Sequence, residues 1–158
     1  MRVPLSRPLA AAVAMAATIP AAAGCADQPG SIIPIQIAAS YVPVPRVPGA
    51  TVAYALIRDN AGADRLVSAT TSDGGQVSFV TPVSPGATAT RVVQWVPVPA
   101  HGDLTMEPDT VHMVITGIGR LVGGDTITLT LRFARAGKVS TQTVVTNPAT
   151  GGSSYFLN

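Results

Sequence analysis

Two histidines and two methionines lie close together in the second half of the chain, and together they have the clearest capacity for metal chemistry. They are His101, Met106, His112 and Met113. Imidazole nitrogen and thioether sulfur are donors that a soft cation such as Cu(I) prefers. Neighbouring residues of a strand point to opposite faces, however, so His112 and Met113 are not expected to chelate one ion together. Spacing alone therefore favours an ordinary interpretation, with both methionines in the core and His112 as a strand histidine.

Catalytic motifs are weak throughout the sequence. A zinc site of the usual kind needs three or four clustered ligands, which the chain does not offer. Asp109 and His112 can be drawn into a serine triad, but no nucleophile elbow frames a serine. The neighbouring carboxylates of Glu107 and Asp109 fit solvated turn residues better than a glycosidase pair. The sequence therefore predicts a protein that is not an enzyme.

A glycine-rich stretch at residues 117–124 looks at first like a nucleotide-binding loop. It has one residue too many before its third glycine, and no helical pattern follows it. We therefore expect a surface turn between strands rather than a phosphate site.

The only cysteine, Cys25, directly follows a segment that has the three parts of an export signal. Arg2 and Arg7 supply the positive start, Leu9 begins a short apolar run, and small residues close the run before the cysteine. A small-small-Gly-Cys sequence at this point resembles the lipobox of bacterial lipoproteins, in which a lipid is attached to the cysteine sulfur. A lipid on Cys25 would hold the chain at the extracytoplasmic face of the cell membrane. An ordinary cleaved signal with an incidental cysteine is the alternative.

These features divide the chain into four parts. Residues 1–24 are the expected signal peptide, 25–31 a flexible tether, 32–146 a folded domain and 147–158 a loose tail. The whole chain has ten Lys and Arg against eight Asp and Glu, and the two arginines of the signal leave with it. The mature chain is thus close to neutral, with no run of like charges, so we expect no nucleic-acid partner.

The domain reads as all-β. Short segments rich in Val, Ile and Thr alternate with turn signals, and none has the period of a helix. The clearest is a hairpin with strands at 126–133 and 139–145; Pro43, Pro45 and Pro48 are expected to keep their segment out of any central ladder. This pattern predicts a cupredoxin-like or Ig-like antiparallel β-sandwich. The other expected strands are Ile32–Ala38, Thr51–Arg58, Arg65–Thr71, Gln76–Thr81, Arg91–Val98 and Val111–Ile115.

The segment 103–145 resembles the extracytoplasmic copper chaperones called PCu(A)C. It has a histidine strand followed by that family's "GD-x-hydrophobic-x-LTL-x-F-x-x-AG-x-V" block, and residues 51–80 resemble the family's preceding strands. The block is present here as Gly124, Asp125, Leu129, Thr130, Leu131, Phe133, Ala136, Gly137 and Val139. The resemblance implies a small cupredoxin-like sandwich that binds one Cu(I) at an exposed site and passes it to a copper-receiving membrane protein.

The resemblance also implies a ligand set of two histidines and two methionines, which this chain matches only in part. His112 matches the second histidine, but Val114 stands where the last methionine is expected. The first histidine falls near Val80, and the first methionine falls within Thr90–Val92. We therefore expect His112 as the anchor ligand, with His101, Met106 and Met113 as possible substitutes.

A second hypothesis is a non-catalytic binding or scaffolding module that has kept the fold and lost the metal. It would meet another envelope protein through an edge strand or the Pro-rich segment 82–101. Trp95 would then be an exposed aromatic anchor, although core packing is the favoured interpretation of this residue.

Overall fold

The computed structural model describes residues 34–147 and residue 149, which form ten β-strands and contain no α-helix. The predicted signal peptide, Cys25, the tether and nearly all of the tail lie outside the described residues, so those predictions stay predictions. The strands are β1 Ile35–Pro43, β2 Ala50–Asp59, β3 Asp64–Thr71, β4 Gln76–Pro82, β5 Thr90–Val93, β6 Val96–Val98, β7 Asp103–Met106, β8 His112–Thr116, β9 Thr126–Phe133 and β10 Gly137–Thr146.

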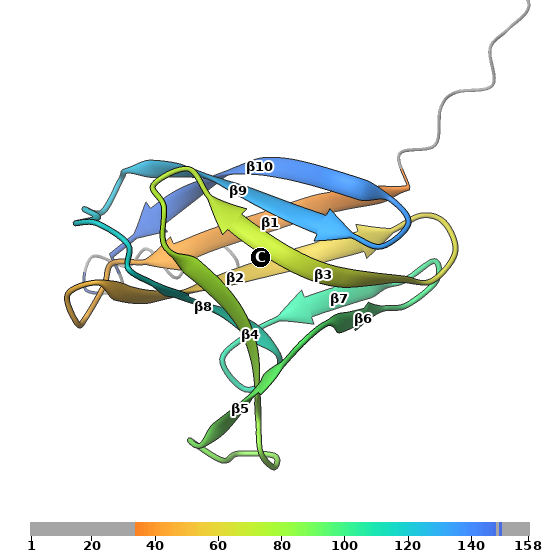
Figure 1. Cartoon of the computed structure of the whole chain (residues 1–158), viewed down its shortest axis with the longest axis horizontal. Helices are drawn as coiled ribbons and strands as arrows, with labels where there is room; N and C mark the ends of the chain where they lie inside the picture. The colour runs from red at the N-terminus through yellow and green to blue at the C-terminus, as the bar shows by residue number, and fades with distance from the viewer. Residues whose placement is uncertain (1–33, 148, 150–158) are drawn as a thin grey trace, which may run out of the picture. The chain divides into compact units, whose positions relative to one another are not determined.

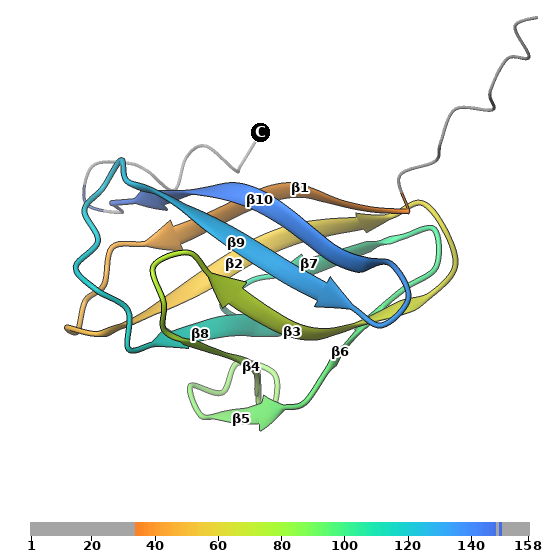
Figure 2. The ribbon, with the colours of Figure 1, turned by 45° about the horizontal axis from the view of Figure 1, so that its top comes forward.

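The strands follow one another around the core in the order β5-β4-β8-β2-β1-β10-β9-β3-β6. β2 is shared between two layers, because its first half pairs with β8 and its second half pairs with β7. The last strand, β6, lies beside β7, so the two layers nearly close around the interior (Figures 1 and 2). This architecture confirms the predicted all-β sandwich.

The core is built by strict alternation along the strands. In β9 the side chains of Ile127, Leu129, Leu131 and Phe133 are all buried, while the residues between them are more exposed. β2 alternates in the same way, with Ala53, Ala55 and Ile57 inside. A period of two places these residues on one face, as the sequence predicts. The predicted β9–β10 hairpin is confirmed, and Gly137 supplies its positive φ of 78°.

Two predictions about β1 are wrong. The strand was expected to end at Ala38, but it runs to Pro43. Pro43 was expected to lie outside any central ladder, but β1 lies in the middle of the sheet, between β2 and β10. Its pairing with β10 is parallel, the one such pair among the described strands. Pro43 is tolerated because it is the last residue of the strand and its carbonyl oxygen accepts the Thr51 hydroxyl at 2.6 Å.

The predicted strand Arg91–Val98 is interrupted, and a strand was missed. β5 ends at Val93 and β6 begins at Val96, with Trp95 at the break and 47% exposed. The core position favoured for Trp95 is therefore wrong. The missed strand, β7, lies along the second half of β2, where it places Met106 opposite Ala55. Short strands of this kind are set by pairing with a neighbour, which local sequence patterns do not record.

Candidate functional site

His112 and Met113 lie at the start of β8 and point to opposite faces of the sheet. Met113 pairs with Ala53 of β2 and is completely buried, so its thioether is part of the core. His112 pairs with Val80 of β4 and lies beside the ring of Tyr54 on the face of the sheet opposite to Met113, where it is 8% exposed. This alternation matches the sequence expectation that the two side chains do not chelate one ion together.

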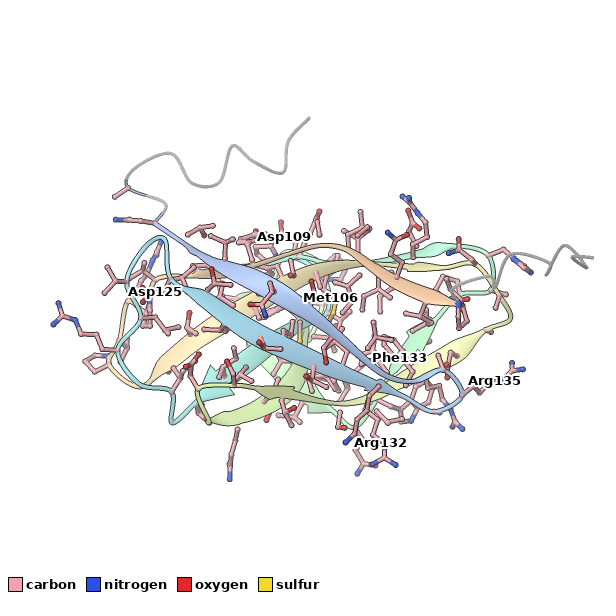
Figure 3. The ribbon with its side chains drawn as sticks, turned by 90° about the horizontal axis from the view of Figure 1, so that it is seen from above. Met106, Asp109, Asp125, Arg132, Phe133 and Arg135 are labelled. Carbon is pink, nitrogen blue, oxygen red and sulfur yellow. The ribbon has the colours of Figure 1, made fainter. Side chains whose placement is uncertain are left out.

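The other two predicted ligands lie apart from the His112 imidazole. Met106 is 1% exposed, pairs with Ala55 and points into the interior (Figure 3), so it belongs to the same core as the buried Met113. His101 is exposed in the turn between β6 and β7, where its φ is 50° and its N–H donates to Ala61 O at 3.0 Å. The structure therefore does not bring these four side chains to one point, and their role as a set stays a prediction.

The hydrogen bond of His112 determines which of its nitrogens is available. Nδ1 lies 3.1 Å from the carbonyl oxygen of Thr110. A carbonyl oxygen can only accept, so Nδ1 holds a proton, and in the neutral imidazole Nε2 then has the lone pair. The same hydrogen bond fixes the orientation of the ring. An imidazole held in this way by a backbone carbonyl is arranged as metal-binding histidines usually are.

Two tyrosines lie next to this histidine, and sequence reasoning missed both as site residues. The ring of Tyr54 lies 6.0 Å from the His112 ring, and the ring of Tyr41 on β1 lies 4.9 Å from that of Tyr54. They could have been found from the alternation of β1 and β2, because Tyr41 and Tyr54 face outwards at paired positions.

The two phenols are neutral at physiological pH. Burial raises the pKa of Tyr41, and the charge of Glu107 raises it further. Burial also raises the pKa of Tyr54, with smaller contributions from Tyr41 and from Asp109 that outweigh the opposing charge of Arg46. Both carboxylates come from the segment that joins β7 to β8, which therefore lies near the tyrosines. The surroundings of His112 are thus aromatic and uncharged, with carboxylates at their border.

The β-sheet register gathers the positions at which the copper-chaperone resemblance expects ligands. Val80 on β4 pairs directly with His112, and Val92 on β5 pairs with Val80. Val114 is two residues beyond His112, on the same face. The four positions thus form one cluster, as the resemblance implies. Three of them are valines here, which have no donor atom.

A shallow groove adjoins this cluster. Its volume is about 540 Å³, and its lining includes Tyr41, Tyr54, Val52, Val114 and Arg46. This size is in the range of small-ligand sites. Among the described residues no group of three or more His, Cys, Asp or Glu side chains is arranged to hold a metal ion. The site as a whole can offer a soft cation one oriented imidazole nitrogen.

The described part of the chain has no helix that is both long and apolar enough to cross a membrane.

Comparisons with known proteins identify relatives of the sequence and of the fold. Residues 35–145 match a family model described as "Putative lipoprotein LpqE-like". The search of curated proteins found no match.

Solved structures share the fold. The copper-bound PCuAC domain from PmoF2 is 22% identical with a TM-score of 0.62, over 73% of this chain and 94% of that one. The apo protein DR1885 from Deinococcus radiodurans is 24% identical with a TM-score of 0.56, over 90% of this chain and 97% of that one. Its Cu(I) form is 25% identical with a TM-score of 0.54, over 79% and 83%. The resemblance to PCu(A)C proteins is confirmed.

Proposed function

The chain belongs to the LpqE-like family, and from this membership we propose that it is a lipoprotein of the cell envelope that handles Cu(I). Its lipid is attached to Cys25 and holds it at the extracytoplasmic face of the cell membrane. The domain binds copper non-catalytically and delivers it to a membrane protein. Support comes from the predicted export signal before Cys25, from the lipoprotein description of the family, and from the copper-bound forms among the structural neighbours.

The observation that most supports copper binding is the orientation of His112. Its Nδ1–H is engaged by Thr110 O, so Nε2 has the lone pair that a Cu(I) ligand needs. The neutral phenols of Tyr41 and Tyr54 beside it favour a singly charged soft ion over a hard divalent ion, which would prefer charged oxygen ligands.

Binding at such a site is weak and exchangeable. One imidazole does not complete the coordination of Cu(I), and Val80, Val92 and Val114 contribute no donor atom. Because His101 lies apart in the β6–β7 turn, the remaining ligands come from solvent molecules, from Met106 or Met113 after rearrangement, or from the protein that gives or receives the copper. A shared site of this kind suits transfer better than storage.

The same three valines favour a second candidate function. A domain that has kept the fold and replaced its ligands would act as a binding module for another envelope protein. Trp95 is then the first residue to examine, because its ring is half exposed next to the Pro-rich segment 82–101.

Titration with Cu(I) against chelators of graded affinity tests the first function. We expect the wild-type protein to compete with a weak chelator, and His112→Ala to lose at least about tenfold in affinity because the anchoring ligand is gone. The matched control is His101→Ala, which removes the other histidine and should leave the affinity unchanged. Equal affinity for wild type and His112→Ala, or no binding by wild type, would instead favour the binding module.

A further inference from the structure

We propose that the outer face formed by Arg65, Trp95, Arg132 and Lys138, called here the cationic face, lies against anionic lipid headgroups of the membrane. The proposal goes beyond copper handling, and it rests only on the anchoring part of the proposed function. It states which side of the domain the lipid on Cys25 turns toward the bilayer.

The three cations gather through the register of β3, β9 and β10. Arg132 of β9 pairs with Ser68 on one side and with Lys138 on the other. Arg65 lies on the same outer face of β3, since its neighbour Leu66 points into the core. All three cationic side chains are exposed. Figure 3 shows Arg132 and Arg135 at the same end of the hairpin, away from Asp125.

None of the three cations of this face takes part in a recorded ion pair among the described residues. The nearest acid in the sequence is Asp64, which is buried and accepts the backbone N–H groups of Arg65, Arg135 and Ala136 at 2.7 to 2.9 Å. Other outward positions on these strands are uncharged, namely Ser68, Thr70, Thr128, Thr130, Ser140 and Gln142. Among the described residues, the ion pair that the structure records is Arg58–Asp103.

Besides its positive charge, this face has an exposed aromatic side chain, Trp95, of the kind that lies at membrane interfaces. Trp95 is 47% exposed, and the Arg65 guanidinium carbon lies 5.5 Å from its ring centroid. This cation–π contact fixes the ring beside the charges. An indole, apolar in its body and with one N–H donor, is the side chain most suited to the headgroup region of a bilayer.

The cationic face also lies at the end of the domain where the tether arrives. Asn60 N donates to Pro34 O at 2.8 Å, and Ile35 pairs with Asp59, so the described chain begins at the turn that joins β2 to β3. Arg135 Nη1 donates to Ala63 O at 3.1 Å in this same turn. Eight residues separate Cys25 from Pro34, and the chain between the two spans at most about 30 Å. A lipid on Cys25 therefore keeps this end of the domain near the headgroups.

Anionic lipid is the partner that these observations favour over an acidic protein. The face is an exposed sheet surface with a tryptophan at its side, and the bilayer is within reach of the tether. Three cations near an anionic surface should favour it over a neutral one by on the order of 100-fold. The attraction should be screened by salt, because the charges are exposed.

Trp95 is the only tryptophan of the chain, so its fluorescence reports directly on this face. The lipidated protein is reconstituted with vesicles of phosphatidylglycerol and phosphatidylcholine, or of phosphatidylcholine alone. We expect a blue shift and quenching by brominated lipid in the anionic vesicles only, reversed by high salt. Arg132→Gln with Lys138→Gln should abolish the response. Arg46→Gln with Arg120→Gln removes equal charge from loops at the other end and should preserve it.

Three results would overturn the proposal. The first is a Trp95 emission that does not change when anionic vesicles are added, and the second is an equal change with neutral vesicles. The third is a change with polyglutamate but not with anionic vesicles, which would indicate an acidic protein as the partner. Vesicle flotation tests the anchor separately, since Cys25→Ser should no longer float with neutral vesicles. The Cys25→Ser chain, mixed with high concentrations of anionic vesicles, shows whether Trp95 fluorescence responds to anionic lipid without the anchor. A failure of the lipid anchor can therefore be told apart from a failure of the cationic face to bind anionic lipid.

Discussion

A variant with Val80→His, Val92→Met and Val114→Met is expected to bind Cu(I) at least about a thousandfold more tightly than the wild-type chain, if each added ligand gives about tenfold or more. The three positions surround His112 through the pairings of β4, β5 and β8. The substitutions would complete a set of two imidazoles and two thioethers, which satisfies the preference of Cu(I) for soft ligands.

A near-identical variant serves as the control. In it Arg91→Met replaces Val92→Met, while the other two substitutions are kept. Arg91 pairs with Thr81 and therefore points to the opposite face of the hairpin. Competition with a strong Cu(I) chelator should show tight binding by the first variant and at least about tenfold weaker binding by the control. If the two variants bind equally, the register does not define the site.

Removing the carboxylate of Asp64 is expected to lower the free energy of unfolding by about 3 kcal/mol, because buried N–H donors lose charged acceptors. Its Oδ1 accepts from Arg65 N and Arg135 N, and its Oδ2 accepts from Ala136 N. These contacts fasten the β9–β10 hairpin to the start of β3. Chemical denaturation of Asp64→Ala measures the loss. Asp73→Ala, in an exposed turn, is the control and should change stability by less than about 0.5 kcal/mol.

The contribution of Asp64 should depend on pH in a defined direction. Burial acts to raise the pKa of this carboxyl, but the N–H donors of Ala136, Arg65 and Arg135 and the Arg135 charge outweigh it and lower the pKa below its ordinary 3.8. A lowered pKa means that the native state favours the ionised form. The stability gap between wild type and Asp64→Ala is therefore full above pH 3.8 and shrinks as the pH falls through the lowered pKa. A gap that is unchanged in acid would contradict this role.

Much of the fold could be predicted because the strands obey a period of two. The alternation from Thr126 to Phe133 and the turn at Gly137 specify the β9–β10 hairpin locally. The parallel pairing of β1 with β10 could not be predicted, because it joins residues about a hundred positions apart with no turn between them. The same holds for β7, a strand of four residues that depends on its pairing with β2.

The site could be predicted at His112 but not around it. The family pattern indicated this histidine, and alternation correctly separated it from Met113. The hydrogen bond to Thr110 O and the rings of Tyr41 and Tyr54 depend on contacts between strands, which spacing in one strand does not reveal. The exposure of Trp95 could not be predicted, because a tryptophan flanked by valines has the pattern of a core residue. Its exposed position follows from the break between β5 and β6, which the local sequence does not reveal.

The most direct test of copper binding is the ¹⁵N spectrum of the histidine side chains during addition of Cu(I). The chain has only His101 and His112, so a single variant assigns all the signals. We predict that Cu(I) shifts the Nε2 signal of His112, while its Nδ1 stays protonated and hydrogen-bonded to Thr110 O. The His101 signals should remain where they are. A spectrum in which Cu(I) leaves Nε2 of His112 unchanged would contradict the assignment of this residue as the copper ligand.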